Sequence, residues 1–200
     1  MERKFYDVVI IGGGIMGSSS AYFLASRMTP EIGKICVIER DPTYSKATTT
    51  HSLGGIRQQF SLAENIQMSQ YSFQFLTEID QHLRIEGCEP PDIQLNRQGY
   101  LFLASKEGEE KMKKNHDLQR KLGCHVKLLS PSELRVQFPW LNTDGITLAS
   151  LGTGDEGWFD PLSLLKAFKR KATHLGVEYI SGEVVDFFSD LNGQISGVKV

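Results

Sequence analysis

The sequence predicts an α/β fold that opens with a strand, a helix and a second strand, and three observations support this prediction. Residues 6–11 form an apolar run short enough for a strand that is buried on both faces. Residues 15–27 have the length of a helix, which Pro30 and Gly33 then break. The β-branched run at 34–39 follows. This order favours two parallel strands joined by a right-handed crossover.

Later segments continue the alternation of helices and strands. A helix is expected after Ser61, with Glu64 completing a capping box and an apolar stripe that begins at Leu62. A second capping box begins at Ser130. The other expected elements are strands at 99–104, 177–180, 183–188 and 195–200, a charged helix at 107–122, and a helix at 162–174 that starts from Asp160. Asn192 and Gly193 predict a tight hairpin between the last two strands.

The amino-acid composition is typical of a globular protein and excludes few functions. Hydrophobic residues make up 40% of the chain and the net charge is −2, so a globular protein is expected and nothing favours nucleic acid or an anionic membrane as partner. The cysteines, Cys36, Cys88 and Cys124, lack metal-ligand spacing, which favours reduced thiols in an intracellular compartment and no metal site. No apolar stretch is long enough for a transmembrane segment, and the first expected strand starts too early for a signal peptide.

A glycine-rich motif follows the first expected strand directly. The run Gly12-Gly13-Gly14-Ile15-Met16-Gly17 matches G-x-G-x-x-G between a strand and a helix, the context that this motif requires. Gly12 permits the tight turn, Gly14 lets the backbone approach a pyrophosphate, and Gly17 lets the helix lie close to the sheet. The pyrophosphate would bind the free N–H groups at the positive end of the helix.

An acidic residue ends the second expected strand. Glu39 can accept hydrogen bonds from both ribose hydroxyls and would repel a 2′-phosphate, which argues against NADP. Glu39 and the adjacent Arg40 are therefore expected to contact the cofactor. The alternative is a glycine-rich turn in an unrelated α/β protein, with Glu39 as a surface acid.

A polar loop after this acid bears on the choice between NAD and FAD. An extended FAD needs contacts beyond its ADP half, and hydroxyls together with backbone N–H groups suit its phosphate and ribityl chain. The residues that could supply them are Thr49, Thr50, His51, Gly54 and Gly55. The alternative is a solvent loop, because Thr, Ser and Gly are common loop formers.

The motif blocks together resemble a known family. The segments YDVVIIGGGIMGSSSAYFLA, VIERD, TTTHSLGGIRQQF and DEGWFDP resemble the D-amino-acid oxidase superfamily of FAD-dependent oxidoreductases, which includes sarcosine oxidases. The resemblance covers nearly the whole chain. It implies a Rossmann-like FAD-binding domain at residues 1–86 and 159–200, with part of a β-rich α+β substrate domain inserted at residues 87–158. Both domains are expected to be incomplete, because the chain ends inside a predicted strand and resembles an N-terminal fragment.

The family resemblance also implies a reaction and further site residues. The reaction is hydride transfer to flavin from a C–H bond next to the nitrogen of an amine or amino acid. Arg57 is the candidate that would stabilise charge on the flavin or hold a substrate carboxylate, and a surface salt bridge is its alternative. Val184 would contact FAD through its backbone, or would be an ordinary core valine. Some family members attach flavin covalently to a histidine in the region of His51, although the flanking residues here match that pattern poorly.

Two functions stay open on the sequence. The later segments are similar to a mitochondrial branch of the family that is linked to assembly of respiratory complex I; they are RQGYLFLAS, LLSPSELRVQFPWLN, DEGWFDP and LGVEYISGEVV. This similarity implies a mitochondrial location, with complex I subunits or assembly factors as partners, and either an amine-oxidising flavoenzyme or a non-enzymatic FAD-binding assembly factor. An NAD-linked dehydrogenase is a weaker third interpretation.

Overall fold

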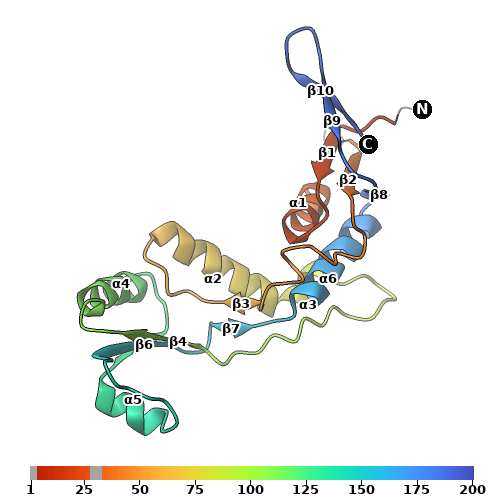
Figure 1. Cartoon of the computed structure of the whole chain (residues 1–200). Coiled ribbons are helices and arrows are strands. Elements are labelled where there is room, and N and C mark those ends of the chain that lie inside the picture. The colour runs from red at the N-terminus through yellow and green to blue at the C-terminus, as the bar shows by residue number, and fades with distance from the viewer. Residues whose placement is uncertain (1–3, 28–32) are drawn as a thin grey trace. The chain divides into compact units, whose positions relative to one another are not determined.

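The computed structural model describes residues 4–27 and 33–200, and its contacts divide the chain into two compact units (Figure 1). Unit 1 comprises Met1–Ser52, Asp80–Ile93 and Asp160–Val200. Unit 2 comprises Leu53–Ile79 and Gln94–Phe159. Pro30, one of the two expected helix breakers, lies outside the described residues.

Unit 1 is built on a three-stranded parallel sheet. Its strands are β1 (Val8–Ile11), β2 (Ile35–Glu39) and β8 (Glu178–Ser181), in the order β1-β2-β8. Val9 pairs with Cys36, and Val37 pairs with Tyr179. The first four residues of β2 are all buried, as expected for a central parallel strand. The predicted parallel pairing of the first two strands is confirmed.

Two long helices of unit 1 pack against each other. These are α1 (Ile15–Ser26) and α6 (Pro161–His174). The Tyr22 and Phe168 rings meet with their centroids 5.5 Å apart. Helix α6 starts as predicted, because the Asp160 carboxylate accepts the Leu162 N–H at 2.9 Å. The short helix α3 (Ile79–Leu83) adds a fully buried Leu83.

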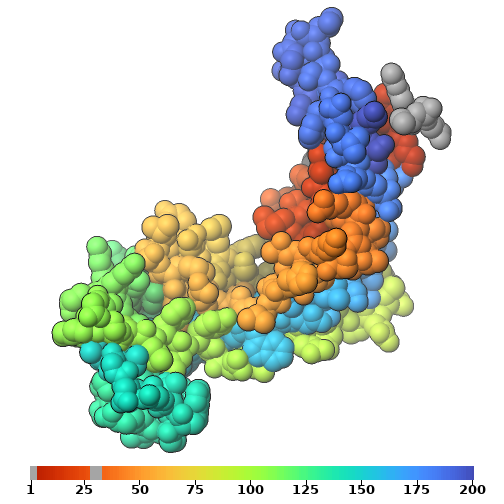
Figure 2. Space-filling view, in the orientation of Figure 1, coloured from red at the N-terminus to blue at the C-terminus, as the bar shows by residue number. Residues whose placement is uncertain are grey.

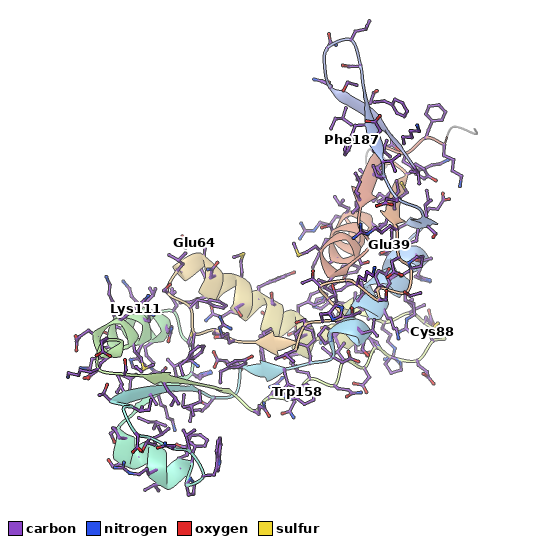
Figure 3. The ribbon with its side chains drawn as sticks, in the orientation of Figure 1. Glu39, Glu64, Cys88, Lys111, Trp158 and Phe187 are labelled. Carbon is purple, nitrogen blue, oxygen red and sulfur yellow. The ribbon has the colours of Figure 1, made fainter. Side chains whose placement is uncertain are left out.

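The predicted hairpin of unit 1 is confirmed. Strands β9 (Asp186–Ser189) and β10 (Ile195–Lys199) pair antiparallel, with an irregular register between Ile195 and Gly197. At its tip the Asp190 N–H donates to the Gln194 carbonyl at 2.8 Å. Phe187, labelled in Figure 3, is 51% exposed, so the hairpin contributes little to the core of the described residues.

Unit 2 contains a three-stranded antiparallel sheet with β6 at its centre. The strands are β4 (Tyr100–Ala104), β5 (Val126–Leu129) and β6 (Leu148–Gly152), in the order β4-β6-β5. Only β4 is predicted from the sequence. Helix α5 (Pro131–Gln137) begins with the predicted Ser130 capping box and buries Leu134 against the sheet.

The remaining elements of unit 2 are two helices and a short strand pair. Helix α2 (Ala63–Thr77) and helix α4 (Glu109–Lys121) contact each other, and Ile66 packs with Cys124 and Val126. Strand β3 (Gly55–Ile56) pairs antiparallel with β7 (Gly157–Trp158).

The predicted start of α2 is wrong. Its N-cap is Leu62, and no side chain caps the helix. The helix begins at Ala63, so Ser61 lies one residue before the cap position and the expected box with Glu64 does not form. Leu62 itself is 58% exposed rather than part of the buried stripe.

The compact units differ from the expected domains mainly in one segment. Residues 53–79 pack with unit 2, although they belong to the cofactor domain expected from the sequence. The division into cofactor and substrate domains remains a prediction. Within the described residues, no helix is long and apolar enough to span a membrane, and no group of three His, Cys, Asp or Glu side chains could hold a metal ion.

Candidate functional site

The glycine-rich turn of unit 1 joins β1 to α1. Gly12 has a φ of +94°, a conformation that side-chain-bearing residues rarely adopt. A Cβ on Gly17 would lie 1.8 Å from the Gly12 carbonyl oxygen, so only glycine lets the helix approach the turn this closely. Two of the motif glycines are therefore required by the protein's own backbone.

Gly14 differs from the other motif glycines. Its φ of −62° is accessible to any residue, and a Cβ there would meet only the Thr49 hydroxyl oxygen, at 3.6 Å. The first intrahelical bond of α1 runs from the Ser18 N–H to the Gly14 carbonyl, so the helix's own ladder uses no N–H group between them. The Ile15 N–H donates to Thr49 at 3.1 Å. Because Gly14 has no side chain, an anion can approach this positive helix end closely over its backbone.

The Glu39 carboxylate is held in place beside the turn. One oxygen accepts the Gly13 N–H at 2.6 Å, and the other accepts the Asp41 N–H at 2.8 Å. Each carboxylate oxygen keeps a second lone pair for a further hydrogen bond. Glu39, labelled in Figure 3 at the end of β2, is therefore oriented before any ligand binds.

A cavity of about 260 Å³ opens at the carboxyl ends of the parallel strands. Open α/β sheets bind their ligands in this position. It is lined by Ile11, Gly12, Ile38, Glu39, Arg40, Gly182, Glu183 and Val184. Arg40 is exposed and its guanidinium lies 3.5 Å from the Glu183 carboxylate. Four residues expected to bind cofactor, namely Gly12, Glu39, Arg40 and Val184, thus line one cavity.

The polar loop after β2 packs beside the start of α1 (orange and red in Figure 2). Thr49 is buried and bonds to Ile15. The Thr50 hydroxyl donates to the Tyr44 and Ala47 carbonyls, at 2.7 and 2.8 Å, so it serves the loop itself. The exposed His51 places Nε2 3.1 Å from the Ser45 carbonyl. Because a carbonyl only accepts, this nitrogen carries the proton.

A buried cluster that the sequence analysis does not identify supports the turn from behind. The fully buried Ser18 donates to the Gly13 carbonyl at 2.7 Å and accepts from the Tyr179 hydroxyl at 3.1 Å. The Lys169 ammonium lies 5.3 and 5.2 Å from the ring centroids of Tyr44 and Tyr179. Burial raises the pKa of Tyr44 to about 12. The glycine turn is thus bonded to Ser18 of α1, which is bonded in turn to Tyr179 of β8.

The remaining expected site residues belong to unit 2. Gly54 is buried, and the adjacent Gly55 pairs with Trp158 of β7. Arg57 follows β3 and is half-buried, with its guanidinium carbon 4.9 Å from the Phe60 ring centroid and 5.5 Å from that of Phe102. Its Nε atom is buried and has no hydrogen-bond partner among the described residues. The half-buried Arg57 guanidinium thus lies over aromatic rings and, within the described part of the chain, does not form the surface salt bridge that was its alternative role.

A buried carboxylate in unit 2 is also missed by the sequence analysis. Glu156 is 2% exposed and accepts the Gln58 N–H at 2.5 Å and the Gln59 N–H at 3.1 Å. Its second oxygen accepts the Gln59 side-chain amide at 2.8 Å. Burial raises the pKa of the Glu156 carboxyl, while the hydrogen bonds and the Arg57 charge oppose this rise. The DEGWFDP block contains Glu156, but its partners lie almost 100 residues earlier in the chain.

These features define a dinucleotide-binding protein: a parallel sheet, a glycine-rich turn at a helix N-terminus, a terminal acid and a cavity at the strand ends. A family model described as FAD dependent oxidoreductase matches residues 7–200. The chain belongs to this family, whose cofactor is FAD. The residues of unit 1 fit the ADP half of that cofactor, because Gly14 leaves open the approach that a pyrophosphate needs.

Individual relatives support the assignment. Over 182 residues the chain is 54% identical to the FAD-dependent oxidoreductase domain-containing protein 1 of Xenopus laevis, covering 90% of this chain and 36% of that protein. The chain thus spans about a third of the length of this relative.

Two solved structures have a similar fold. The L-proline dehydrogenase of P. horikoshii has a TM-score of 0.81 and 30% identity, covering 99% of this chain and 50% of that one. The glycine oxidase of Bacillus cereus has a TM-score of 0.74 and 26% identity, covering 97% and 51%.

Proposed function

We propose that this chain carries the FAD-binding turn and a substrate-binding arginine of an enzyme that oxidises the C–N bond of an amine or an N-methyl amino acid. The observation that carries the proposal is the cavity at the ends of β1, β2 and β8, into which the glycine turn and Glu39 both open. Family membership identifies the dinucleotide as FAD.

The chain's own residues divide the work of holding the cofactor. Within residues 12–17, the N–H groups of Gly14, Met16 and Gly17 bind the pyrophosphate, because those of Gly12, Gly13 and Ile15 already donate to Ile38, Glu39 and Thr49. Glu39 accepts hydrogen bonds from the ribose hydroxyls. Arg40 and the Val184 backbone border the same cavity. Thr49, Thr50 and His51 shape the loop beside the turn. Gly54 and Gly55, in unit 2, are proposed as further cofactor contacts.

Bound FAD supplies a hydride acceptor for a C–H bond next to nitrogen. The protein's task is to orient the substrate, and Arg57 suits this task because its stacked guanidinium is fixed in place. A substrate carboxylate would accept charge-assisted hydrogen bonds from the half-buried Arg57 guanidinium.

The names of the structural relatives support an amino-acid substrate. One is an L-proline dehydrogenase and another is a glycine oxidase, so both act on compounds that carry an amine next to a carboxylate. A carboxylate in the substrate agrees with the role proposed for Arg57. We therefore propose secondary amino acids, such as sarcosine and L-proline, as the first compounds to test.

The test is anaerobic reduction of the flavin in the full-length protein. Sarcosine or L-proline should bleach the absorbance of oxidised FAD, and Arg57→Met should slow this reduction by about a hundredfold because the substrate is no longer oriented. Retention of FAD by the variant is the control. Unchanged flavin absorbance with a broad panel of secondary and primary amines would contradict an amine-oxidising function.

The sequence resemblance supports a second function for the same chain. In this proposal the protein is mitochondrial and binds subunits or assembly factors of respiratory complex I, with or without catalysis. A protein that retains FAD but is reduced by no amine, and that copurifies with complex I intermediates, would favour the assembly function.

Acid precipitation followed by measurement of flavin in the pellet would test covalent attachment at His51.

A further inference from the structure

The peptide unit between Arg57 and Gln58 is held on both sides by side chains. The Ser69 hydroxyl, on α2, donates to the Arg57 carbonyl. The Gln58 N–H of the same peptide donates to the Glu156 carboxylate at 2.5 Å. Arg57 follows β3 and lies outside any strand, so side chains replace the backbone partners that a sheet would provide.

Glu156 anchors a larger network around this peptide. Besides two backbone N–H groups, it accepts the Gln59 side-chain amide, whose oxygen accepts the Ser150 hydroxyl at 2.6 Å. Glu156 forms no ion pair within 4 Å among the described residues. Desolvation of an unpaired carboxylate is costly. Hydrogen bonds to Gln58 and Gln59 take the place of the ion pair, so the buried carboxylate serves to hold this stretch of backbone.

We propose that Ser69 and Glu156 are positioning residues, which together fix the Arg57 backbone so that the guanidinium stays stacked between Phe60 and Phe102. The negative charge of Glu156 also balances the half-buried guanidinium when no anionic ligand is present. This proposal rests on the proposed function of Arg57 as the group that binds a substrate carboxylate. Neither residue touches the substrate, and both act through Arg57.

The binding test uses pyrrole-2-carboxylate and the full-length protein with FAD bound. This compound resembles proline but has no saturated α-carbon to oxidise, so its dissociation constant is measurable from the flavin spectrum. Ser69→Ala and Glu156→Gln should each weaken binding about tenfold, because a charge-assisted hydrogen bond from Arg57 is lost or misdirected. Ser69→Thr keeps the hydroxyl and should restore binding. Ser72→Ala, on the same helix, and Asp155→Asn, beside Glu156, are matched controls that should bind normally.

A double-mutant cycle separates positioning from general damage to the fold. In an Arg57→Met background, Ser69→Ala should cause no further loss, because its effect passes through Arg57. Additive losses, or weaker FAD binding in Ser69→Ala, would overturn the proposal and indicate a structural role.

A direct measurement keeps the two proposals distinguishable. The buried Arg57 Nε–H should give a slowly exchanging NMR signal, assigned by its disappearance in Arg57→Met, and both positioning variants should exchange it faster. Unchanged exchange would overturn the positioning role whatever the ligand does. If exchange accelerates but Arg57→Met binds pyrrole-2-carboxylate normally, the positioning role stands and the substrate role of Arg57 fails.

Discussion

At the scale of single residues, the glycines of the turn have different reasons to be glycine: the fold requires Gly17, whereas ligand binding explains Gly14. Gly17 faces the Gly12 carbonyl so closely that any side chain would push the helix away. Gly14 has ordinary backbone angles and free space around its missing Cβ. The protein's own packing gives no reason for glycine at position 14, whereas close approach of a pyrophosphate does.

This contrast predicts that alanine at position 14 weakens FAD binding, whereas alanine at position 17 lowers the stability of the fold. Gly14→Ala should leave the free energy of unfolding of the FAD-free protein within about 0.5 kcal/mol of the wild type. It should nevertheless weaken FAD binding by about tenfold or more, because the methyl group occupies the approach to the N–H groups. Gly17→Ala should lose about 1–3 kcal/mol of stability through overpacking. Urea unfolding measures the free energy of unfolding, and fluorescence titration measures the affinity for FAD. Unchanged FAD affinity in Gly14→Ala would contradict pyrophosphate binding at this turn.

From residue spacing alone, the candidate site was predictable where its chemistry is local in sequence, whereas Val184 was expected only from the family resemblance. Gly12, Gly14 and Glu39 belong to one strand–helix–strand unit, and the motif spacing already assigns each a role. The burial of Glu156 was not predictable, because its hydrogen-bond partners, the backbone N–H groups of Gln58 and Gln59, are distant in sequence. The support that Tyr179 gives to Ser18 is equally distant in sequence.

At the scale of elements, helix starts show how far capping signals can be read. The Ser130 box forms with both of its hydrogen bonds, and Pro131 occupies the first helical turn. The similar pattern at Ser61 does not form, because Leu62 adopts the extended conformation of the N-cap and the helix starts one residue later than the box requires. Ile66, in the first turn of α2, packs against Cys124 and Val126.

The two serines therefore offer a matched pair for mutation. Ser130→Ala should reduce the free energy of unfolding by about 1 kcal/mol, since it removes an N-cap acceptor. Ser61→Ala should change it by less than about 0.5 kcal/mol, because this exposed serine caps no helix. Chemical denaturation followed by circular dichroism measures both. Equal losses in the two variants would show that the capping geometry is not decisive.

Strands were predictable where apolar runs are long, and not where pairing partners supply the stability. Residues 6–11 and 34–39 indicate β1 and β2 by composition alone. The central strand β6 has the sequence LASLG, which carries no clear strand signal. It is a strand because β4 and β5 pair with its two edges and Ala149 fits the tight core between them.

At the scale of the whole molecule, the cysteines distribute usefully over the two units. Cys36 is buried in unit 1, Cys124 is buried in unit 2, and Cys88 is exposed. Burial raises the pKa of the Cys36 thiol to about 11 and also raises that of Cys124. Since the thiolate is the reactive form, both buried thiols are protected by burial and by protonation.

Thiol labelling should therefore report the opening of each unit separately. In the native protein, Cys88 should react within minutes at pH 8, while Cys36 and Cys124 should wait for unfolding of their units. Peptide mass mapping at increasing urea concentrations gives the rate at each cysteine, and Cys88→Ser should remove only the fast phase. Rapid labelling of Cys36 without urea would contradict the packing of β2.

The hydrogen bonding of the Arg57–Gln58 peptide by side chains affects how this protein can evolve. A hydrogen bond between two backbone groups survives almost every codon change, because only proline removes the donor. Here the two partners are the side chains of Ser69 and Glu156, so a single nucleotide substitution can delete either one. Under the proposed role of Arg57, substrate preference can therefore change through Ser69 and Glu156 while the arginine codon stays the same.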